Sequence, residues 1–318
     1  MTRSAHEIEL VVCEDLDPAL DLLREAGFRL DSIYPADSPH TALLSNGEGR
    51  AVRLTTRPDL PPPTAAQPEF EPEFLVSRAG HDPEPGRAGM LYRDLIPGRL
   101  GGRYIASHIV IPGGGPVADW VHFHRVAFQM IAVRSGWVRV VYEGQGEPFV
   151  MNAGDIVLQP PEIRHRVLES SPGVEVIEIS GPALHETFAD HELGLPGGGL
   201  TPERHYFGQK FLRHVAADAP WNPWHGGEAQ ETEMSAATGG LAEVRLLRPG
   251  ADPSIAVTPH EGELVFGFVL DGSAMLDCRG DTRLGPADAF VIPPAEAWGL
   301  SGLSPDLRLL HVTTAKSA

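Results

Sequence analysis

The sequence lacks several features that mark particular classes of protein. Cysteine occurs only at Cys13 and Cys278 among 318 residues, so a disulfide framework and a cysteine-based metal site are both disfavoured. No apolar run approaches the roughly 20 residues that a membrane-spanning helix needs. The first residues lack the apolar stretch and cleavage site of a signal peptide, so we expect a cytoplasmic protein.

Positive charge is also scarce. The chain has 25 Lys and Arg against 43 Asp and Glu, which gives a formal net charge of −18. Lysine occurs only at Lys210 and Lys316, so nearly all of the positive charge is arginine. Such a surface repels nucleic acid and anionic membranes on average. We therefore expect a small-molecule partner and no nucleic-acid or membrane partner.

Glycine and proline, in contrast, are abundant. The chain has 35 Gly and 30 Pro spread along its length, which suits many short strands joined by turns better than long helices. From residue 88 to 182, short β-branched runs alternate with Gly/Pro turns, and the same layout returns from 239 to 318. The sequence therefore predicts a mainly β chain with an internal repeat.

Residues 1–58 have a different pattern. A strand-like run, a helix-like run with an acidic start that ends at Gly27, and three further strand-like runs follow one another. This order resembles one βαβββ module of the glyoxalase-like (vicinal-oxygen-chelate) family. That family builds its metal site from paired modules with His or Glu ligands, and the predicted strands at 41–46 and 51–56 carry neither. We predict a docking or dimerisation module, and expect a homodimer.

The stretch "WVHFHRVAFQMIAVRSG" carries the strongest chemical signal. His122 and His124 stand one residue apart, Gln129 follows after four residues, and Gly136 follows after six more. Because alternate residues of a strand share a face, the two imidazoles should point the same way. A second group, Gly154, Pro160 and His165, stands about forty residues later.

These spacings resemble the two motifs of the cupin superfamily, with Gln129 in place of a glutamate and Glu162 in place of a glycine. The resemblance implies two jelly-roll barrels, a bicupin, preceded by the small α+β module. The expected boundaries are 1–58 for the module, 59–87 for a Pro-rich linker, 88–182 for a metal-binding barrel, 183–238 for a connection, and 239–318 for a second barrel.

The resemblance implies one divalent transition metal held by His122, His124, His165 and Gln129. Three imidazoles and one oxygen donor suit Fe(II), which we favour, and also Mn, Ni or Zn. A glutamine brings no negative charge, so the metal keeps its full Lewis acidity, which favours non-redox chemistry. Alternatively, Gln129 is a hydrogen-bond donor beside the ligands.

The second half of the repeat has lost most of these residues. When the two halves are aligned on their turn glycines, His260 matches His124, but Thr258, Val265 and Trp298 stand at the other three positions. We therefore predict a metal-free C-terminal barrel. It is either a structural partner or a small apolar pocket lined by Trp298.

Two residues near the motifs are candidate catalytic groups. Arg164 could grip a substrate carboxylate, or could form an ion pair with Glu162. Tyr142 could donate a proton, or simply cap a strand. Four more residues are candidates for lining the substrate pocket: Trp120, Arg103, Tyr104 and His108. On the strand that holds the last three, alternation allows either Arg103 or the pair Tyr104 and His108 to face inward, but not both.

Bicupins of this kind resemble dioxygenases, decarboxylases, and hydrolases or isomerases of small acids. The first hypothesis is an iron(II)-dependent dioxygenase that acts on a small anionic or phenolic substrate. The second is a non-redox isomerase, lyase or hydrolase of a sugar acid or ureido acid, which the neutral Gln129 favours. The third is a metal- or ligand-sensing protein without turnover.

Overall fold

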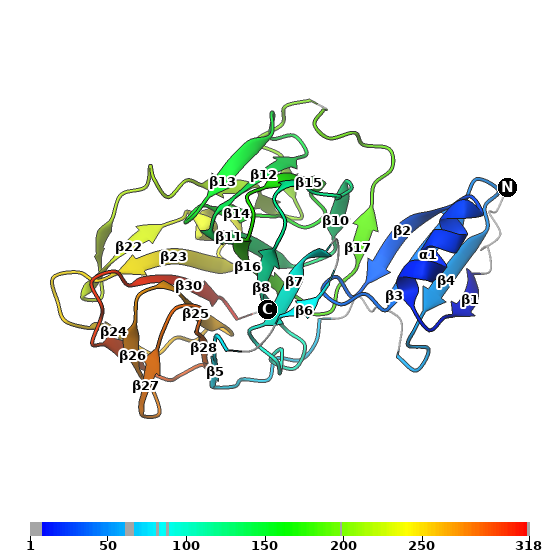
Figure 1. Cartoon of the computed structure of the whole chain (residues 1–318). Coiled ribbons are helices and arrows are strands. Elements are labelled where there is room, and N and C mark those ends of the chain that lie inside the picture. The colour runs from blue at the N-terminus through cyan, green and yellow to red at the C-terminus, as the bar shows by residue number, and fades with distance from the viewer. Residues whose placement is uncertain (1–7, 61–66, 81–82, 87–88, 198, 317–318) are drawn as a thin grey trace.

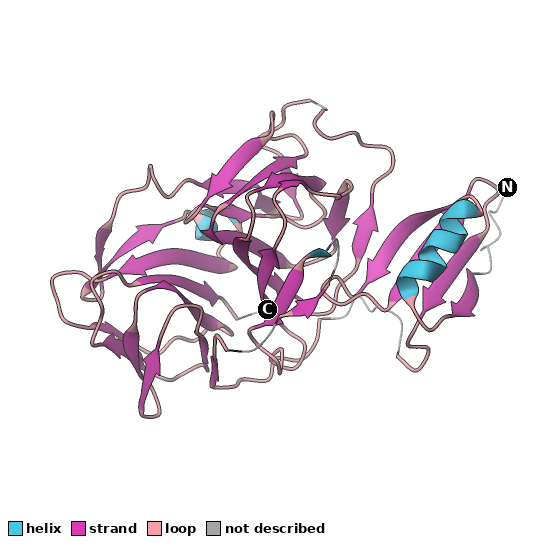
Figure 2. Ribbon diagram, viewed as in Figure 1, coloured by secondary structure: helices cyan, strands magenta, loops and turns pink. Residues whose placement is uncertain are grey.

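The computed structural model describes residues 8–60, 67–80, 83–86, 89–197 and 199–316. The chain is mainly β, with one helix of three turns in the N-terminal module and little other helix (Figures 1 and 2). Two jelly-roll barrels follow the module along the chain, so the predicted bicupin fold is confirmed. Among the described residues, no helix is long and apolar enough to cross a membrane.

The N-terminal module has the predicted βαβββ order. Its four strands form a sheet in the order β1-β4-β3-β2, in which β1 and β4 are parallel. The side chain of Asp15 caps α1 by accepting a hydrogen bond from the backbone of Asp17, and Gly27 takes a left-handed φ of 84° just after the helix. The resemblance to glyoxalase-like modules stays a prediction. The elements are β1 (Ile8–Val12), α1 (Leu16–Glu25), β2 (Phe28–Tyr34), β3 (Thr41–Asn46) and β4 (Ala51–Thr55).

The N-terminal barrel consists of two facing sheets. One has the order β20-β14-β11-β16-β8-β7-β6, and the other continues the sheet of the module as β2-β17-β10-β15-β12-β13, with β9 beside β15. The bounds are β6 (Glu84–Pro85), β7 (Leu91–Asp94), β8 (Ile105–Ile111), β9 (Gly115–Pro116), β10 (His122–His124), β11 (Phe128–Ser135), β12 (Trp137–Tyr142), β13 (Phe149–Asn152), β14 (Ile156–Leu158), β15 (His165–Ser170), β16 (Val174–Gly181), β17 (Thr187–Ala189) and β20 (Leu212–His214).

The C-terminal barrel repeats this plan. Its sheets have the orders β21-β22-β23-β30-β25-β28-β5 and β24-β29-β26-β27. The bounds are β5 (Leu75–Ser77), β21 (Asn222–Trp224), β22 (Gly227–Glu231), β23 (Ala242–Arg248), β24 (Ile255–Val257), β25 (Val265–Asp271), β26 (Ala274–Asp277), β27 (Asp281–Leu284), β28 (Ala289–Ile292), β29 (Trp298–Ser301) and β30 (Arg308–Thr314). Between the barrels lie the hairpin β18 (His205–Tyr206) and β19 (Gln209–Lys210), and α2 (Met234–Ala237).

The two connecting segments are part of the barrels rather than separate linkers. Within the expected linker 59–87, β5 pairs with β28 at the edge of the C-terminal barrel. Within 183–238, β17 and β20 pair with strands of the N-terminal barrel, whereas β22 pairs with β23 of the C-terminal one. Each connection therefore covers an otherwise open sheet edge.

One hydrophobic core joins the two barrels. Large side chains of β11 and β25, including Phe128, Met130, Phe266 and Phe268, are almost completely buried in the same cluster. The seven-stranded sheets therefore pack against each other through their outer faces, in the manner of a sheet sandwich. Each barrel keeps its other face for its own interior.

Candidate metal centre

The metal-site prediction rests on three histidines, and the structure brings all three together. On β10, His122 and His124 point into the barrel, and on β15 His165 stands directly opposite His122. One ligand atom from each ring lies within 4.8 Å of the other two, close to the span of two metal–imidazole bonds of about 2.1 Å each. All three are buried, at 1%, 7% and 6% exposure.

The neighbours of the triad fix the orientation of each ring through Nδ1. The Nδ1 of His122 lies 2.8 Å from the carbonyl oxygen of Trp120, and that of His165 lies 3.0 Å from the carbonyl oxygen of Ile163. A carbonyl only accepts, so Nδ1 carries the proton in both rings and Nε2 carries the lone pair. The Nδ1 of His124 lies 3.2 Å from the hydroxyl of Thr187.

A buried carboxylate supports His122 further. Asp119 is 7% exposed, and its Oδ1 lies 3.5 Å from the Nδ1 of His122. Its Oδ2 accepts a hydrogen bond of 2.9 Å from the backbone N–H of Val167, which holds the carboxylate in place. Carboxylates and carbonyls behind metal-binding histidines fix the tautomer and raise the basicity of the ligand. The donor set therefore fits a divalent transition metal.

The second motif is tied to the first through the backbone. Glu162 stands where the cupin motif has glycine, and its φ of 61° lies in the left-handed region that favours glycine. Its N–H donates to the carbonyl oxygen of His124 at 3.0 Å. The sequence signature at 160–165 thus marks the turn that brings His165 to the triad.

Gln129 faces the barrel interior from β11 and is 1% exposed. Its amide nitrogen donates a 3.0 Å hydrogen bond to Oε1 of Glu178 on β16, which the hydroxyl of Ser180 also contacts at 3.2 Å. This is the hydrogen-bonding role left open for Gln129 in the sequence analysis, and ligation by its carbonyl oxygen stays a prediction.

Glu178 is a residue of the site that the sequence reasoning missed. Together with the three histidines it lines a cavity of about 90 Å³ whose other walls are largely apolar. The available signal was an acidic residue at an alternating position of the apolar run "VEVIEIS". Alternation alone did not say which face of that run points inward.

Tyr142 lies beside the triad, and its predicted catalytic role stays a prediction. It lines the same cavity, and its ring stacks on His165 with centroids 5.6 Å apart. Its hydroxyl accepts a 3.0 Å hydrogen bond from Nε2 of Gln159. Burial raises the pKa of Tyr142 above its usual value, so the phenol stays protonated.

Trp120 does not line this cavity, contrary to the prediction. Its ring packs against the hydrophobic core of the N-terminal module and lines a hollow beside α1. The ring still meets His122 edge-on, with centroids 5.2 Å apart. Trp120 precedes β10, so the alternation assumed from the strand does not extend to it.

Arg164 is also placed outside the cavity. Its Nε donates to Asp190 at 2.9 Å, and its guanidinium lies 4.1 Å from the ring centre of Phe123. Phe123 points away from the two histidines of its strand and stacks on Phe188 at 5.1 Å. Arg164 therefore does not reach the cavity to grip a substrate there, and the expected partner Glu162 contributes only its carbonyl oxygen.

Arg103 and Tyr104 belong to the contact between the barrels. Nε and Nη2 of Arg103 pair with the carboxylate of Glu263 at 2.9 and 3.1 Å, and the Tyr104 hydroxyl donates to Oε2 of Glu263 at 3.0 Å. Burial raises the pKa of Tyr104 to about 12. Both residues precede β8, so strand alternation does not separate them.

His108 faces the wrong way for the site. On β8 it is the odd-numbered residues Ile109 and Ile111 that line the cavity. His108 points to the opposite face, where Nε2 lies 2.6 Å from Glu175 and the ring meets Phe268 of the other barrel. Of the four residues predicted to line the pocket, none does.

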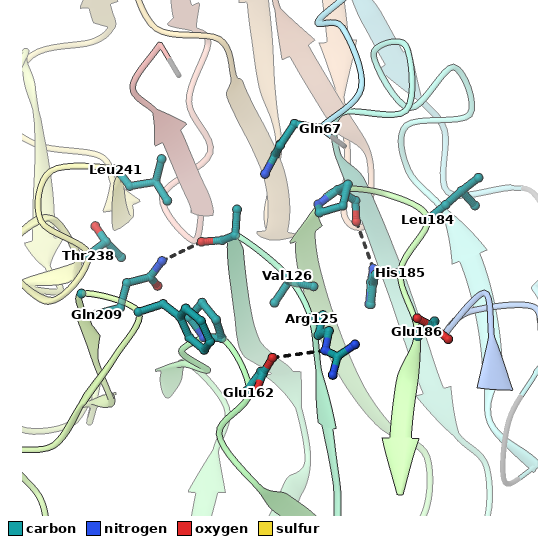
Figure 3. Close-up of a pocket in the computed structure, with 15 residues that line it drawn as sticks. Gln67, Arg125, Val126, Glu162, Leu184, His185, Glu186, Gln209, Thr238 and Leu241 are labelled. Atoms are coloured by element: carbon teal, nitrogen blue, oxygen red, sulfur yellow. Dashed lines mark hydrogen bonds and ion pairs between the residues drawn. The ribbon is translucent and has the colours of Figure 1, made fainter. Parts of the chain in front are cut away.

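A larger cleft lies outside the triad (Figure 3). It has a volume of about 780 Å³, and Arg125 and Glu162 form an ion pair of 3.2 Å on its wall. His185, which hydrogen-bonds the carbonyl of Pro182, lines this cleft and also meets the ring of His124 at 5.3 Å. A small polar pocket shares His124 and Glu178 with the cavity and His185 with the cleft. No motif spacing in the sequence marks His185 as a residue of this region.

Among the described residues, the C-terminal barrel has no equivalent triad. In the pairing of β24 with β29, Val257 stands opposite Trp298, as His122 stands opposite His165. Within the part of the chain that the structure describes, the triad on β10 and β15 is the only group of three such residues close enough for a metal. Trp298 is 3% exposed and packs in the core of its barrel.

Solved structures with the same fold are cupin-type proteins. The chain is similar to YlbA from E. coli, with 11% identity, a TM-score of 0.55, and coverage of 80% of this chain and 96% of that one. It is similar to salicylate 1,2-dioxygenase from Pseudaminobacter salicylatoxidans, with 16% identity, a TM-score of 0.56, and coverage of 81% and 88%. It is also similar to oxalate decarboxylase from Bacillus subtilis, studied for its Mn(II) centres, with 11% identity, a TM-score of 0.54, and coverage of 83% of this chain and 81% of that one.

No family model matches the chain, and no curated protein matches its sequence. At these identities the neighbours show the fold, a bicupin. Function has to come from the residues of the site.

Proposed function

We propose that this chain is a metal-dependent enzyme that acts on a small organic acid or phenolic compound, and that its reaction is an iron(II)-dependent dioxygenation. The observation that carries the proposal is the buried triad of His122, His124 and His165, with each Nδ1 engaged by a protein oxygen. Three neutral imidazoles leave coordination positions open to substrate. The similarity to salicylate 1,2-dioxygenase, one structure of which contains gentisate, supports the substrate class.

The residues around the triad have separable roles. A divalent metal, when bound, supplies Lewis acidity and, if it is iron(II), reducing electrons for dioxygen. Asp119 and the carbonyl of Trp120 hold the His122 ring in its ligating orientation. The apolar walls of the cavity exclude water, which strengthens electrostatic interactions inside it.

The dimensions favour a small substrate. The cavity of about 90 Å³ lies well below the roughly 300–1,000 Å³ of most organic-ligand pockets, whereas the cleft of about 780 Å³ lies within that range. We infer that the reacting atoms enter the cavity past His185 and that the rest of a larger substrate stays in the cleft. The Arg125 side chain, which is 60% exposed and pairs with Glu162, would attract an anionic substrate.

A second candidate function is a non-redox isomerase, lyase or hydrolase, because Glu178 places a carboxylate in the same cavity as the triad. A carboxylate within reach of a polarised substrate is suited to move a proton. Gln129 and Ser180 hold that carboxylate in position. Tyr142 would remain a neutral hydrogen-bond donor in either reaction.

The test is an oxygen electrode assay with protein loaded anaerobically with Fe(II) and offered salicylate, gentisate and oxalate in turn. Oxygen uptake that matches substrate loss, and that disappears in His165→Ala, is the expected result. Substrate loss without oxygen uptake would support the second candidate. In that case Glu178→Gln should lower kcat by roughly 10²–10⁴-fold. If the metal-loaded chain turns over neither these compounds nor sugar and ureido acids, the enzyme proposal fails and a sensor is favoured.

A further inference from the structure

The C-terminal barrel contains a hollow that the metal site does not explain. It has a volume of about 400 Å³, within the usual range for small organic ligands. Its walls come from β21, β23, β30 and the segment after β24. The residues that matter for its chemistry are Trp224, His225, Arg245, His260 and His311.

His311 is the least explained side chain of this hollow. It is 2% exposed, yet among the described residues neither of its ring nitrogens has a hydrogen-bond partner. Nearly all buried polar groups in proteins are hydrogen-bonded, so a histidine with two orphaned nitrogens needs an explanation. Trp224 and Trp298 flank its ring, each with centroids 5.4 Å away.

A second orphaned atom belongs to His260, which also lines the hollow. Nε2 of His260 lies 3.4 Å from the carbonyl oxygen of Ile292, so it carries the proton, and Nδ1 is left as an acceptor. This Nδ1 is buried and has no partner in the described part of the chain. The hollow therefore offers acceptors from two rings, and His311, which burial keeps neutral by lowering its pKa to about 3, offers a donor as well.

The charged side chains on the walls of the hollow already form ion pairs with one another or with neighbouring residues. Arg245 bonds to Glu231 at 2.8 Å and to Glu243 as well. A ligand anion would compete with these two carboxylates for Arg245, and a ligand cation would compete with Arg245 for Glu243. The hollow is therefore suited to a neutral molecule. A metal is disfavoured, because in the described ranges the three histidines of the hollow form no cluster of metal-binding size.

We propose that this hollow is a second ligand-binding site, which takes a small neutral aromatic ring bearing a hydroxyl or N–H group. The ring would stack on the indole of Trp224, and its polar group would pair with Nδ1 of His260 and a ring nitrogen of His311. Aromatic walls favour a planar ligand through offset or edge contacts. The site is independent of the triad and of the proposed reaction.

The experiment uses the full chain with His122→Ala and His165→Ala, treated with a chelator, so that the first site cannot contribute. The probes are phenol, 2-pyridone and 4-hydroxybenzamide, with toluene as an apolar control, 4-hydroxybenzoate as an anionic control and Zn²⁺ as a metal control. Binding is measured by ligand-detected NMR. The neutral polar rings should bind at least tenfold more tightly than toluene or 4-hydroxybenzoate.

Further variants locate the binding. His311→Phe keeps an aromatic ring at this position but removes both nitrogens. It should weaken binding of the polar probes at least tenfold. His260→Leu should do the same and serves if His311→Phe does not fold. His191→Phe, at an exposed histidine outside the hollow, should change nothing. The proposal is overturned if no polar ring outbinds toluene, if neither variant weakens binding, or if only Zn²⁺ binds in a His311-dependent way.

Discussion

Glu178 and His311 occupy the same position in the two barrels. Glu178 on β16 stands opposite Ile131 of β11, and His311 on β30 stands opposite Gly267 of β25, at the matching point of the repeat. Gly267 is required there, because an added Cβ would lie 2.1 Å from the ring of Phe290. One fold thus presents an inward carboxylate beside a histidine triad in one barrel, and an inward neutral imidazole between tryptophans in the other.

We expect about one divalent metal per chain, lost when any residue of the triad is removed. His122→Ala and His165→Ala should each abolish metal content measured by mass spectrometry after mild chelation, because two imidazoles hold an ion much more weakly than three. Gln129→Ala tests the open question of the fourth ligand. Retained metal would make Gln129 a support for Glu178, whereas a loss comparable to that of the histidine variants would make it a ligand.

Asp119→Asn should weaken metal binding about 10–100-fold without removing any ligand. The carboxylate lies 3.5 Å from Nδ1 of His122 and is held by the N–H of Val167. The measurement is a competition titration with a chromophoric chelator. Asp190→Asn is a matched control, since Asp190 pairs with Arg164 outside the cavity. Equal affinities of wild type and Asp119→Asn would contradict this role for Asp119.

Removing one partner of the ion pair between Arg103 and Glu263 should destabilise the protein much more than replacing both partners. Both side chains are 8% exposed, and Tyr104 completes the hydrogen bonding of the carboxylate. Glu263→Ala alone should lower the free energy of unfolding by about 3–5 kcal/mol, since it leaves a buried guanidinium without its partner. The double variant Arg103→Met/Glu263→Met should recover most of that loss in urea denaturation. A single variant within about 1 kcal/mol of wild type would refute the assignment.

His311 should make the protein less stable as the pH falls. In the folded protein burial, reinforced by Arg245 and the nearby histidines, lowers the pKa of His311 from 6.5 to about 3. The unfolded chain therefore takes up the proton first as the pH drops. The stabilisation is complete above pH 6.5 and is lost between pH 6.5 and about 3, at up to about 1.4 kcal/mol per pH unit.

His311→Phe removes this titration, so its free energy of unfolding should depend less steeply on pH below 6.5 than that of wild type. Urea denaturation at several pH values between 7.5 and 4.5, with His191→Phe as control, measures the difference in slope. Parallel curves for wild type and His311→Phe would show that His311 titrates normally in the folded state.

The predictions that succeeded rest on local rules. Strand alternation put His122 and His124 on one face, and the spacing to the second motif carried His165 to the same barrel. The repeat of turns and β-branched runs predicted two barrels of one plan. The prediction that the second barrel holds no metal, made from Trp298 at the place of His165, stays a prediction. Each of these depends on residues close in sequence or on a pattern that recurs.

The predictions that failed concern which face of a strand lines the cavity and which face packs against the other barrel. His108 lies on β8, whose odd-numbered residues face the cavity while its even-numbered ones face the other barrel. Arg103, Tyr104 and Trp120 precede their strands and are placed by contacts far away in sequence. Both faces of these strands are covered, so apolar and polar residues alternate without marking the inside.

The sequence by itself determined the mainly β bicupin fold and the three histidines, because period-two alternation and motif spacing are local properties of the chain. Only the tertiary structure decided that Glu178, Asp119 and His185 join the triad, and that His311 lies in a hollow of the second barrel. These positions depend on which strands pair and which sheets pack together, and such contacts join residues that no local pattern connects.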